Sequence, residues 1–530
     1  MANILCRKVS FGYDGTERNV FTDLDLVIDT GWRTALTGRN GRGKTTLLRL
    51  IQGELVPDRG SIERPVDVQG FPVSIADATI SAFDAAKDAA GPFRRWEREM
   101  ARLLDTGDEV SLARYGTLQT RFQEAGGYEM DANLERELAA LGIDSALRSR
   151  RFDRLSGGER TRCLLAGLFA RQAGFPLIDE PTNHLDRAGR EHVAEYLHAK
   201  PGFLIVSHDR AFLDGCVDHV IALNPDTVET RRCSFSTWRQ AFLERLARQE
   251  GANTELRREI GRLEDAAGQR RRGAEKREAE KGAHTDKGFI GARAARQMKR
   301  AIAVEHRAEK AVEERRQTLV DIERTYPLRL PGPSRHRARP LVTAHDLVVV
   351  RDKPLFAPIS FRVRSGDRLA VVGPNGSGKT SLLEVLRQAP LAFEGTFTRP
   401  ARLDIARVSQ QPRWTTGFLS DHCAAGGIDE SRFRQVTAAL GVRGDTLERR
   451  LESMSPGQRK KIELARSFLS PADLLLWDEP LNFLDIDARE AIQEVVLQDT
   501  PTMVFVEHDA VFVDLVATAT LELRPPEDVN

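Results

Sequence analysis

Two glycine-rich segments carry residue types suited to holding phosphate groups. GRNGRGKT spans residues 38–45 and GPNGSGKT spans residues 373–380, and each lies between a short apolar run and a leucine-rich run, as in a strand, loop and helix. The glycines let backbone N–H groups converge on phosphate oxygens, Lys44 and Lys379 neutralise charge, and the threonine after each lysine can bind Mg²⁺. The segments predict two sites for ATP and Mg²⁺. The predicted ATP-binding residues of the loops are Gly38, Asn40, Gly41, Gly43, Lys44, Thr45, Thr46, Gly373, Asn375, Gly376, Gly378, Lys379, Thr380 and Ser381.

Carboxylates and histidines recur in the same order after each glycine loop. FPLIDEP (residues 175–181) and LLLWDEP (residues 474–480) are apolar runs that end in two acids, and VSHD and VEHD follow them. The first acid of each pair suits Mg²⁺, the second suits the orientation or deprotonation of the attacking water, and the histidine can contact the γ-phosphate. The predicted metal ligands are Thr45, Asp179, Thr380 and Asp478, and the predicted catalytic residues are Glu180, Glu479, His208 and His508.

The spacing of these motifs locates an insertion in the first module. Gly38 and Gly373 are 335 residues apart, whereas Asp179 and Asp478 are 299 residues apart. Ser156 and Ser455 are also 299 residues apart, so the first module holds about 36 additional residues between its glycine loop and Ser156. They are expected within residues 74–128, a stretch with helical patterning that includes FRRWEREMARLL.

The composition is that of a globular protein with several domains. The 530 residues are 41% hydrophobic and 30% charged, and the net charge of +1 gives no argument for a polyanionic partner of the whole chain. The five cysteines show no CxxC or Cys/His spacing, which argues against a disulfide framework or a zinc site. No signal-peptide core and no apolar run of about 18 residues is found, so a cytoplasmic protein without a membrane span is expected.

Between glycine loop and acids lie LSGGER (residues 155–160) and MSPGQR (residues 454–459), each before a helical stretch. With these loops the chain resembles the ATP-binding cassette superfamily, in which the signature loop of one cassette binds the γ-phosphate held by the other. The resemblance implies an α/β fold with two tandem P-loop domains and two composite ATP sites. It assigns signature roles to Ser156, Gly157, Gly158, Glu159, Ser455, Gly457 and Gln458.

A long charged segment separates the two modules. Residues 1–237 and 341–530 are expected to form the cassettes, 238–326 a helical linker and 327–340 a connector. Leu256, Ile260 and Leu263 have helical spacing, which together with later apolar positions predicts two antiparallel helices of 35 to 40 residues, each about 50 to 60 Å long. Two cassettes joined in this way resemble the ABC-F family of ribosome-binding ATPases across nearly the full length.

The turn of the expected hairpin is basic. Residues 269–300 contain eleven basic and four acidic side chains. A solvated charged face is one interpretation, but Phe289 and Ile290 between two glycines suit insertion among RNA bases, with the cations on backbone phosphates. The predicted RNA or tRNA contacts are Arg270, Arg271, Arg272, Lys276, Arg277, Lys287, Phe289 and Ile290.

Two motifs of the second module depart from the usual cassette sequences and are similar to those of one branch of ABC-F. MSPGQRKK replaces the usual signature, and DEPLNFLD stands where the first module has DEPTNHLD. Both are similar to the branch of ABC-F that protects ribosomes from lincosamides, pleuromutilins and streptogramin A. That branch implies binding at the exit-tRNA site of the 70S ribosome, contacts with ribosomal RNA and tRNA, and antibiotic displacement by the linker. It also implies a monomer whose cassettes pair within one chain.

Three other functions compete with this one. A housekeeping ABC-F factor that relieves stalled ribosomes shares the same architecture. A transporter's ATPase subunit leaves the basic hairpin unexplained. A DNA-repair ATPase requires zinc cysteines or far longer coiled coils, so no DNA partner is expected.

The two predicted sites are not identical. Val73 stands where the second module has Gln410, a residue that in cassettes couples Mg²⁺ and water to the helical subdomain. Tyr13 can stack on the first adenine, whereas the equivalent stretch of the second module offers Arg351. Pro456 lacks the N–H that could face phosphate, so unequal sites are expected. The helical insertion is either a ribosome-contacting arm or an ordinary amphipathic part of the cassette.

Overall fold

The computed structural model describes residues 2–13, 15, 19–171, 174–224, 227–280, 310, 328–330, 340–410, 412–442 and 444–526. The chain divides into two compact units, residues 1–236 with 326–530 and residues 237–325. The first unit contains both cassettes. Of the expected hairpin, residues 281–309 and 311–327 lie outside the described residues.

The first cassette contains two sheets. Its strands are β1 (Asn3–Phe11), β2 (Phe21–Asp29), β3 (Arg33–Thr37), β4 (Arg59–Glu63), β5 (Val68–Phe71), β6 (Phe175–Asp179), β7 (Phe203–Val206), β8 (His219–Leu223) and β9 (Val228–Arg232). The order β5-β6-β7-β3-β8-β9 is parallel except for β9, and β2-β1-β4 is antiparallel. Because parallel strands end at one edge, the loops after β3, β6 and β7 meet there.

Helices cover the sheets of the first cassette and form a separate bundle. They are α1 (Lys44–Gln52), α2 (Ala82–Ala90), α3 (Phe93–Thr106), α4 (Glu109–Glu124), α5 (Met130–Ala140), α6 (Ser145–Ser149), α7 (Gly157–Ala170), α8 (Arg187–His198) and α9 (Arg210–Cys216). Leucines and Ile51 bury one face of α1 against strands β1, β2, β3 and β6. This packing fixes the glycine loop that precedes α1.

The second cassette repeats this plan. Its strands are β10 (Val342–Val349), β11 (Ile359–Val363), β12 (Arg368–Val372), β13 (Phe393–Thr398), β14 (Ile405–Val408), β15 (Leu474–Asp478), β16 (Met503–Val506) and β17 (Ala519–Glu522). Its helices are α12 (Lys379–Leu386), α13 (Leu419–Gly426), α14 (Glu430–Ala439), α15 (Pro456–Leu469), α16 (Ile486–Asp499) and α17 (Ala510–Val516). The sheet orders are β14-β15-β16-β12-β17 and β11-β10-β13. The expected α/β fold with two tandem cassettes is confirmed.

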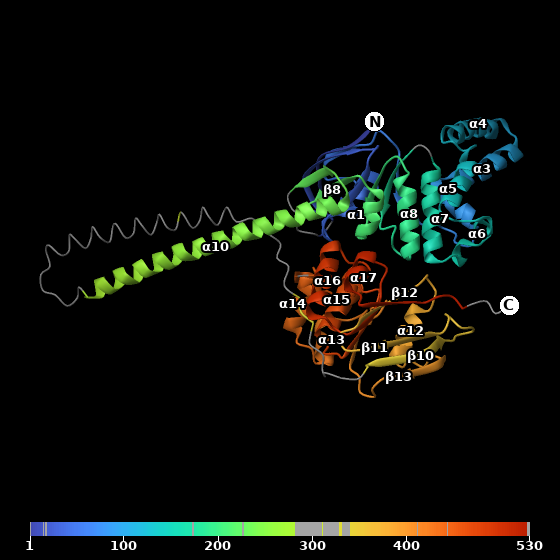
Figure 1. Ribbon diagram of the computed structural model, residues 1–530. Coiled ribbons are helices and arrows are strands. Elements are labelled where there is room, and N and C mark those ends of the chain that lie inside the picture. Colours follow the sequence, from blue (N-terminus) through green and yellow to red (C-terminus); the bar gives the residue numbers. More distant parts are fainter. Residues whose placement is uncertain are drawn as a thin grey trace, which may run out of the picture. The chain divides into compact units, whose positions relative to one another are not determined.

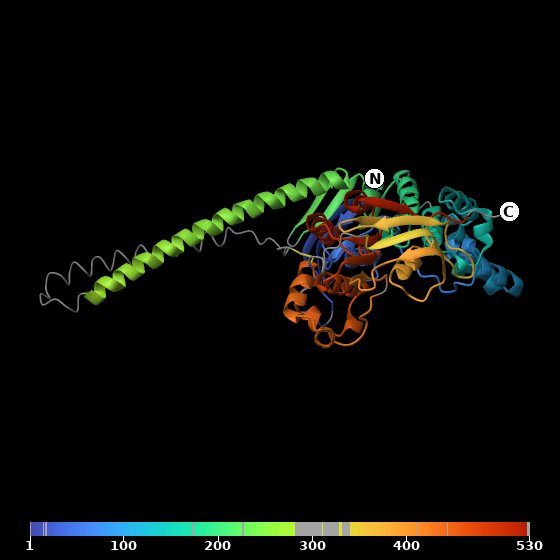
Figure 2. The same ribbon diagram turned by 60° about the horizontal axis from the view of Figure 1, so that its bottom comes forward.

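The insertion of the first cassette is the pair α3 and α4. The chain runs through 39 residues from α2 to α5 (91–129) but through 3 residues from α13 to α14 (427–429). The difference equals the additional length inferred from motif spacing. In two views the pair stands out from α2, α5 and α7 (Figures 1 and 2).

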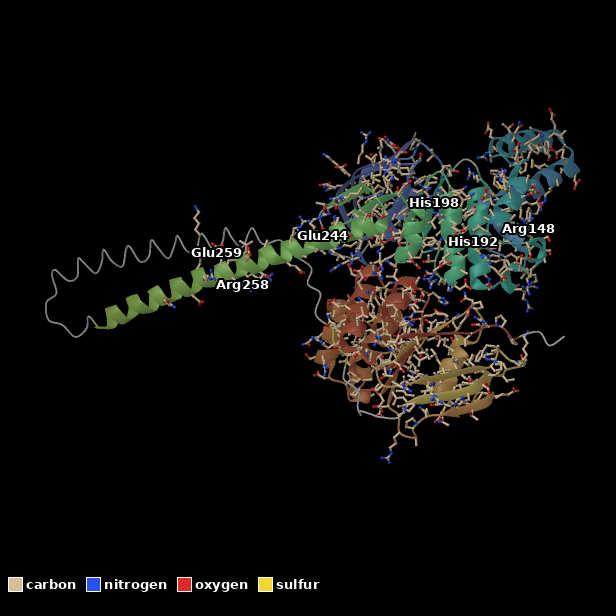
Figure 3. The ribbon with its side chains drawn as sticks, in the orientation of Figure 1. Arg148, His192, His198, Glu244, Arg258 and Glu259 are labelled. Carbon is tan, nitrogen blue, oxygen red and sulfur yellow. The ribbon has the colours of Figure 1, made fainter. Side chains whose placement is uncertain are left out.

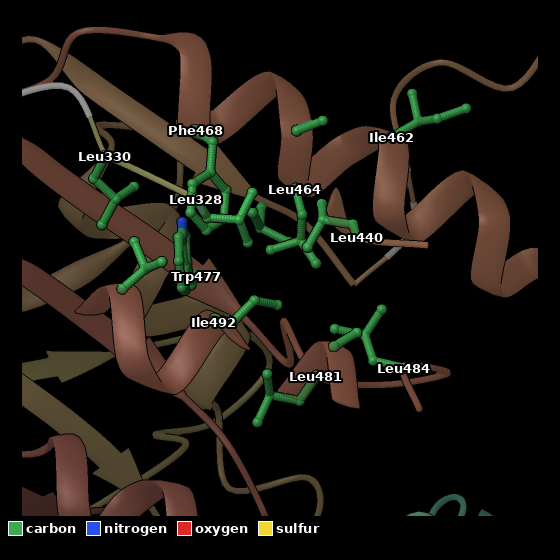
Figure 4. Packing of buried hydrophobic residues seen from close by; sticks show 14 of the residues in the cluster. Leu328, Leu330, Leu440, Ile462, Leu464, Phe468, Trp477, Leu481, Leu484 and Ile492 are labelled. Carbon is green, nitrogen blue, oxygen red and sulfur yellow. The ribbon is translucent and has the colours of Figure 1, made fainter. Parts of the chain in front are cut away.

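A large apolar core joins the connector to the second cassette. Trp477 of β15 and Phe468 of α15 lie 5.9 Å apart between ring centroids, and Leu328 and Leu330 of the connector pack in the same cluster (Figure 4). The backbone N–H of Leu330 donates to Asp499 at 2.7 Å. This core holds α15 firmly against β15.

The linker begins with one long helix, α10 (Phe235–Glu280). It has 46 residues, more than expected, because the basic run that follows Gln269 continues with good helix formers. Ile260 is buried, while Arg258 and Glu259 are exposed on the helix surface (Figure 3). At 1.5 Å per residue, α10 is about 69 Å long.

Candidate ATP-binding sites

The first glycine loop joins β3 to α1 and leaves no room for a side chain at Gly43. Gly43 has φ 84°, and a Cβ there would meet Val20 Cγ1 at 2.5 Å, so only glycine is tolerated. Lys44 starts α1, and its Nζ donates to the carbonyl oxygen of Gly38 at 2.6 Å. The ammonium group is therefore folded over the loop whose N–H groups would hold phosphate.

The second loop has the same construction. Gly378 has φ 89°, and a Cβ on Gly373 would meet the carbonyl oxygen of Leu523 at 2.8 Å. Lys379 Nζ donates to the carbonyl oxygen of Gly373 at 2.8 Å and to that of Pro374 at 2.9 Å. Both predicted phosphate loops are thus preformed.

The first acid of each pair ends a strand beside a threonine hydroxyl. Thr45 Oγ1 donates to Asp179 Oδ2 at 2.8 Å. Asp478 Oδ1 is buried without a hydrogen-bond partner among the described residues. Hydroxyl and carboxylate oxygens are the ligand types of Mg²⁺, and an unpaired buried carboxylate oxygen fits a cation. The residues present therefore suit the ion.

The second acid of each pair adopts a rare backbone conformation. Glu180 has φ 50° and Glu479 has φ 47°, a left-handed region that is strained for residues other than glycine. Their N–H groups donate to the carbonyl oxygens of Val206 and Val506 at 2.8 and 2.9 Å. Backbone strain of this kind is concentrated at functional sites.

A histidine faces each glutamate. The distance from His208 Nε2 to Glu180 Oε1 is 3.4 Å, and that from His508 Nε2 to Glu479 Oε1 is 3.7 Å. Burial and the positive charge of Lys44 hold the pKa of His208 well below its usual value. His208 is therefore neutral at pH 7 and can accept or donate one hydrogen bond at the site.

The two glutamates differ in protonation. Burial, together with the charge of Asp179, raises the pKa of Glu180 to about 7. Burial also acts on Glu479, but the nearby His508 ring, a hydrogen bond from Gln410 and the charge of Lys460 bring the pKa of Glu479 below its ordinary value. The two sites are thus electrostatically unequal before any ligand binds.

The signature loops are helix N-termini. Ser156 caps α7 and Ser455 caps α15, each through a capping box. Glu159 and Gln458 return to the N–H groups of those serines at 2.7 and 2.9 Å. Their side chains therefore stabilise the signature helices in this structure.

Residues of both cassettes line one cleft. It has a volume of about 430 Å³ and corresponds to the composite site expected for the second phosphate loop. Its walls include Ser156, Gly157, His184, Asn375, Gly376, Gly378, Lys379, Thr380, Ser381, Gln410, Glu479 and His508.

Each phosphate loop also has a contact with an aspartate of the other cassette. The N–H of Asn40 donates to Asp485 Oδ2 at 3.2 Å, and the N–H of Asn375 donates to Asp186 Oδ2 at 3.4 Å. These aspartates were not among the residues predicted from the sequence. The available signal was their identical place in the two DEP motifs, seven residues after Asp179 and Asp478.

The side chains expected at the adenines lie beside the start of α1 and α12. Tyr13 Oη is 3.1 Å from Thr46 Oγ1, and Arg351 donates to Ser381 Oγ at 3.3 Å. Tyr13 and Arg351 therefore occupy corresponding places in the two cassettes.

Strand register aligns the positions after β5 and β14. Phe71 pairs with Ile178, and Val408 pairs with Trp477. Each partner directly precedes the Mg²⁺-suited aspartate of its cassette. Counting from these pairs, Val73 corresponds to Gln410, whose Nε2 donates to Glu479 Oε2 at 3.4 Å.

The predicted RNA contacts are not tested by this geometry. Arg270, Arg271, Arg272, Lys276 and Arg277 lie on the backbone of α10, with side chains outside the described part. Lys287, Phe289 and Ile290 also lie outside it. None of the helices in the described part of the chain combines the length and apolarity needed to cross a membrane.

Comparison with known proteins identifies the family. The ABC transporter family model matches residues 21–183 and 356–482. The tylosin resistance ATP-binding protein TlrC of Streptomyces fradiae is 30% identical, over 96% of this chain and 95% of that protein. The energy-dependent translational throttle protein EttA of Mycobacterium tuberculosis is 27% identical, over 97% of this chain and 90% of that protein.

The fold is also found in solved structures. The archaeal ribosome recycling factor aABCE1, in complex with stalk protein aP1, matches with a TM-score of 0.55 at 19% identity, over 97% of this chain and 87% of that chain. At this identity the likeness concerns the fold alone. The family model and the relatives matched over nearly the whole chain lead to one conclusion: the chain is an ATP-hydrolysing member of the ABC-F family of ATP-binding cassette proteins.

Proposed function

We propose that this ATPase binds the ribosome at the exit-tRNA site and displaces antibiotics from the peptidyl-transferase centre through its interdomain linker. The observation that carries the proposal is the continuous helix α10, which lies in the chain between two cassettes that each carry a phosphate loop and an acidic pair. Its length of about 69 Å suits a probe that reaches far from the cassettes. The similarity to a tylosin resistance protein over nearly the whole chain supports the protective role.

The proposed cycle assigns roles to residues of both cassettes. Lys44 and Lys379 bind phosphate oxygens, Asp179 and Asp478 hold Mg²⁺, which neutralises phosphate charge, and the signature serines close each site. The closed cassettes bind the ribosome. Glu180 and Glu479 then orient or deprotonate water, and hydrolysis releases the protein.

The proposal is tested by trapping the closed state. Glu180→Gln/Glu479→Gln keeps the lysines and metal ligands but removes the carboxylates, so hydrolysis should fall about 10²- to 10⁴-fold. The variant should cosediment with 70S ribosomes in ATP, and cryo-EM should show it at the exit-tRNA site. The matched control is Glu195→Gln/Glu494→Gln, which changes exposed glutamates at equivalent places in α8 and α16. Free sedimentation of the trap variant contradicts the proposal and favours a transporter subunit.

A housekeeping translation factor is the second candidate, favoured by the similarity to EttA over 97% of this chain. Replacement of Phe289 and Ile290 by alanine discriminates, because two side chains contribute little affinity beside the cassettes but would lie nearest the drug. We expect trapping to persist while the inhibitory concentration of a lincosamide or pleuromutilin falls in expressing cells. If the unaltered protein protects against no drug of this class, the housekeeping role replaces the protective one.

A further inference from the structure

The signature helix of the second cassette carries a buried cation. Lys460 of α15 is 1% exposed. Its Nζ donates to the carbonyl oxygen of Ser409 at 2.8 Å and to that of Asp478 at 3.2 Å. These carbonyls directly precede Gln410 and Glu479. The ammonium group therefore joins α15 to two strand ends of the second ATP site.

Carboxylates compensate the buried charge. Burial lowers the pKa of Lys460, and the negative charges of Asp478 and Glu507 act against that effect. Glu507 is buried after β16, and its Oε2 accepts the N–H of Leu481 at 3.1 Å. The ammonium group is therefore held by its hydrogen bonds to two backbone carbonyl oxygens as well as by the nearby negative charges.

The adjacent lysine leads to the other site. Lys461 is 2% exposed, and its Nζ lies 3.4 Å from Asp485 Oδ2. The same carboxylate oxygen accepts the N–H of Asn40 in the first phosphate loop at 3.2 Å. Two neighbouring residues of α15 thus connect to opposite ATP sites.

The first cassette lacks this connection. Thr161 and Arg162 occupy the places of the two lysines, and Ser207 that of Glu507. Arg162 donates instead to the carbonyl oxygen of Leu141 at 3.0 Å. Since Val73 also stands in the place of Gln410, four residues of the second-cassette cluster differ between the cassettes.

We propose that Lys460 and Lys461 are positioning residues that couple the two ATP sites through α15. A displacement of Ser409 and Asp478 when the second site fills is carried by Lys460 to α15, and from there by Lys461 and Asp485 to the first phosphate loop. The inference rests on the assignment of both phosphate loops to ATP. By thermodynamic linkage, ATP at either site must change the affinity of the other site by the same factor. The residues that transmit the effect nevertheless lie in the second cassette.

The test is a cycle of binding measurements with a fluorescent ATP analogue in the Glu180→Gln/Glu479→Gln background. Binding at the first site is recognised because Lys44→Ala abolishes it. The affinity of this site is measured once with the second site intact and once with the second site emptied by Lys379→Ala. Emptying the second site should weaken the first about fivefold or more. In the Lys460→Met variant, emptying the second site should change the affinity of the first site less than about twofold.

Further variants keep the result interpretable. Lys460→Thr introduces the residue of the first cassette, and Lys461→Met breaks the other half of the route; both should lose the coupling and remain folded by thermal unfolding. Thr161→Ala and Arg162→Met should retain it. Unchanged coupling in folded Lys460 or Lys461 variants, or no coupling in the parent, overturns the inference. Absence of ATP binding in the parent would instead overturn the site assignment.

Discussion

At the scale of single residues, corresponding side chains of the two cassettes have different surroundings. Glu479 accepts hydrogen bonds from Gln410 and Asn482, whereas the position of Gln410 is Val73 in the first cassette. The pKa of Glu479 lies below its ordinary value, and that of Glu180 is about 7. Glu479, the predicted base of the second site, is therefore ionised at lower pH than Glu180, the predicted base of the first site.

Gln410→Val should raise the pKa of Glu479, because a hydrogen bond to the charged form is lost. In a Glu180→Gln background, where hydrolysis occurs in the second site, the acidic limb of the kcat/KM profile should move to higher pH, since a base with a raised pKa is protonated over a wider range. Gln498→Val, at an exposed glutamine of α16, is the control and should leave the limb in place. A limb that does not move for Gln410→Val would exclude this role for the amide.

At the scale of elements, the α3–α4 arm is attached to its cassette by ion pairs and aromatic packing. Arg94 of α3, in the insertion that could contact the ribosome, pairs with Asp84 and Asp88 of α2 at 3.0 and 2.7 Å. Lys87 of α2 joins Glu97 of the arm at 2.6 Å. Such contacts direct Arg94 inward, away from an external partner.

Replacement of residues 91–129 by the three-residue connection of the second cassette should leave a folded ATPase. Phe93 and Phe122, 6.1 Å apart between ring centroids, pack on each other and would be removed together. We expect ribosome-free ATPase activity within about twofold of the parent, because buried Lys87 keeps its ion pair with Asp131 at 2.7 Å and the arm contributes none of the predicted ATP-site residues. Sedimentation of the same deletion in the trap background then decides between a ribosome-contacting arm and an ordinary part of the cassette.

The sequence predicted elements whose signals are local or repeated. Glycine loops, acidic strand ends and the place of the arm followed from motif order and spacing. Lys460 and Asp485 did not, because a charged residue in MSPGQRKK or DEPLNFLD looks the same whether solvated or buried. Their partners, Ser409 and Asn40, are supplied by distant strands and by the other cassette.

At the scale of the whole molecule, charge is distributed unequally across the cassette interface. Arg39 pairs with Asp487 at 2.7 Å, and Arg210 with Glu490 at 3.2 Å. The first cassette supplies the cations and the second the anions. At the places of Arg39 and Asp487 on the other side of the interface, the chain has Pro374 and Ala188.

Charge reversal tests this interface. Asp487→Arg places like charges together, so the ATP concentration for half-maximal hydrolysis should rise about two- to fivefold, in keeping with the 0.2–1 kcal/mol typical of partly exposed pairs. The double change Arg39→Asp/Asp487→Arg should restore much of the loss. High salt should diminish both effects. Equal behaviour of the single and double variants would show that the pair is not formed in the closed state.

The attachment of α10 has a mechanical consequence. Ser236 in its first turn donates its N–H to Asp214 of α9 at 2.8 Å, and α9 begins two residues after His208. A helix about 69 Å long acts as a lever, so a tilt of about 5° at this end would sweep the other end through about 6 Å. A sub-ångström shift of α9 at a bound nucleotide would then be amplified to a displacement on the scale of a nucleobase at the far end of the helix.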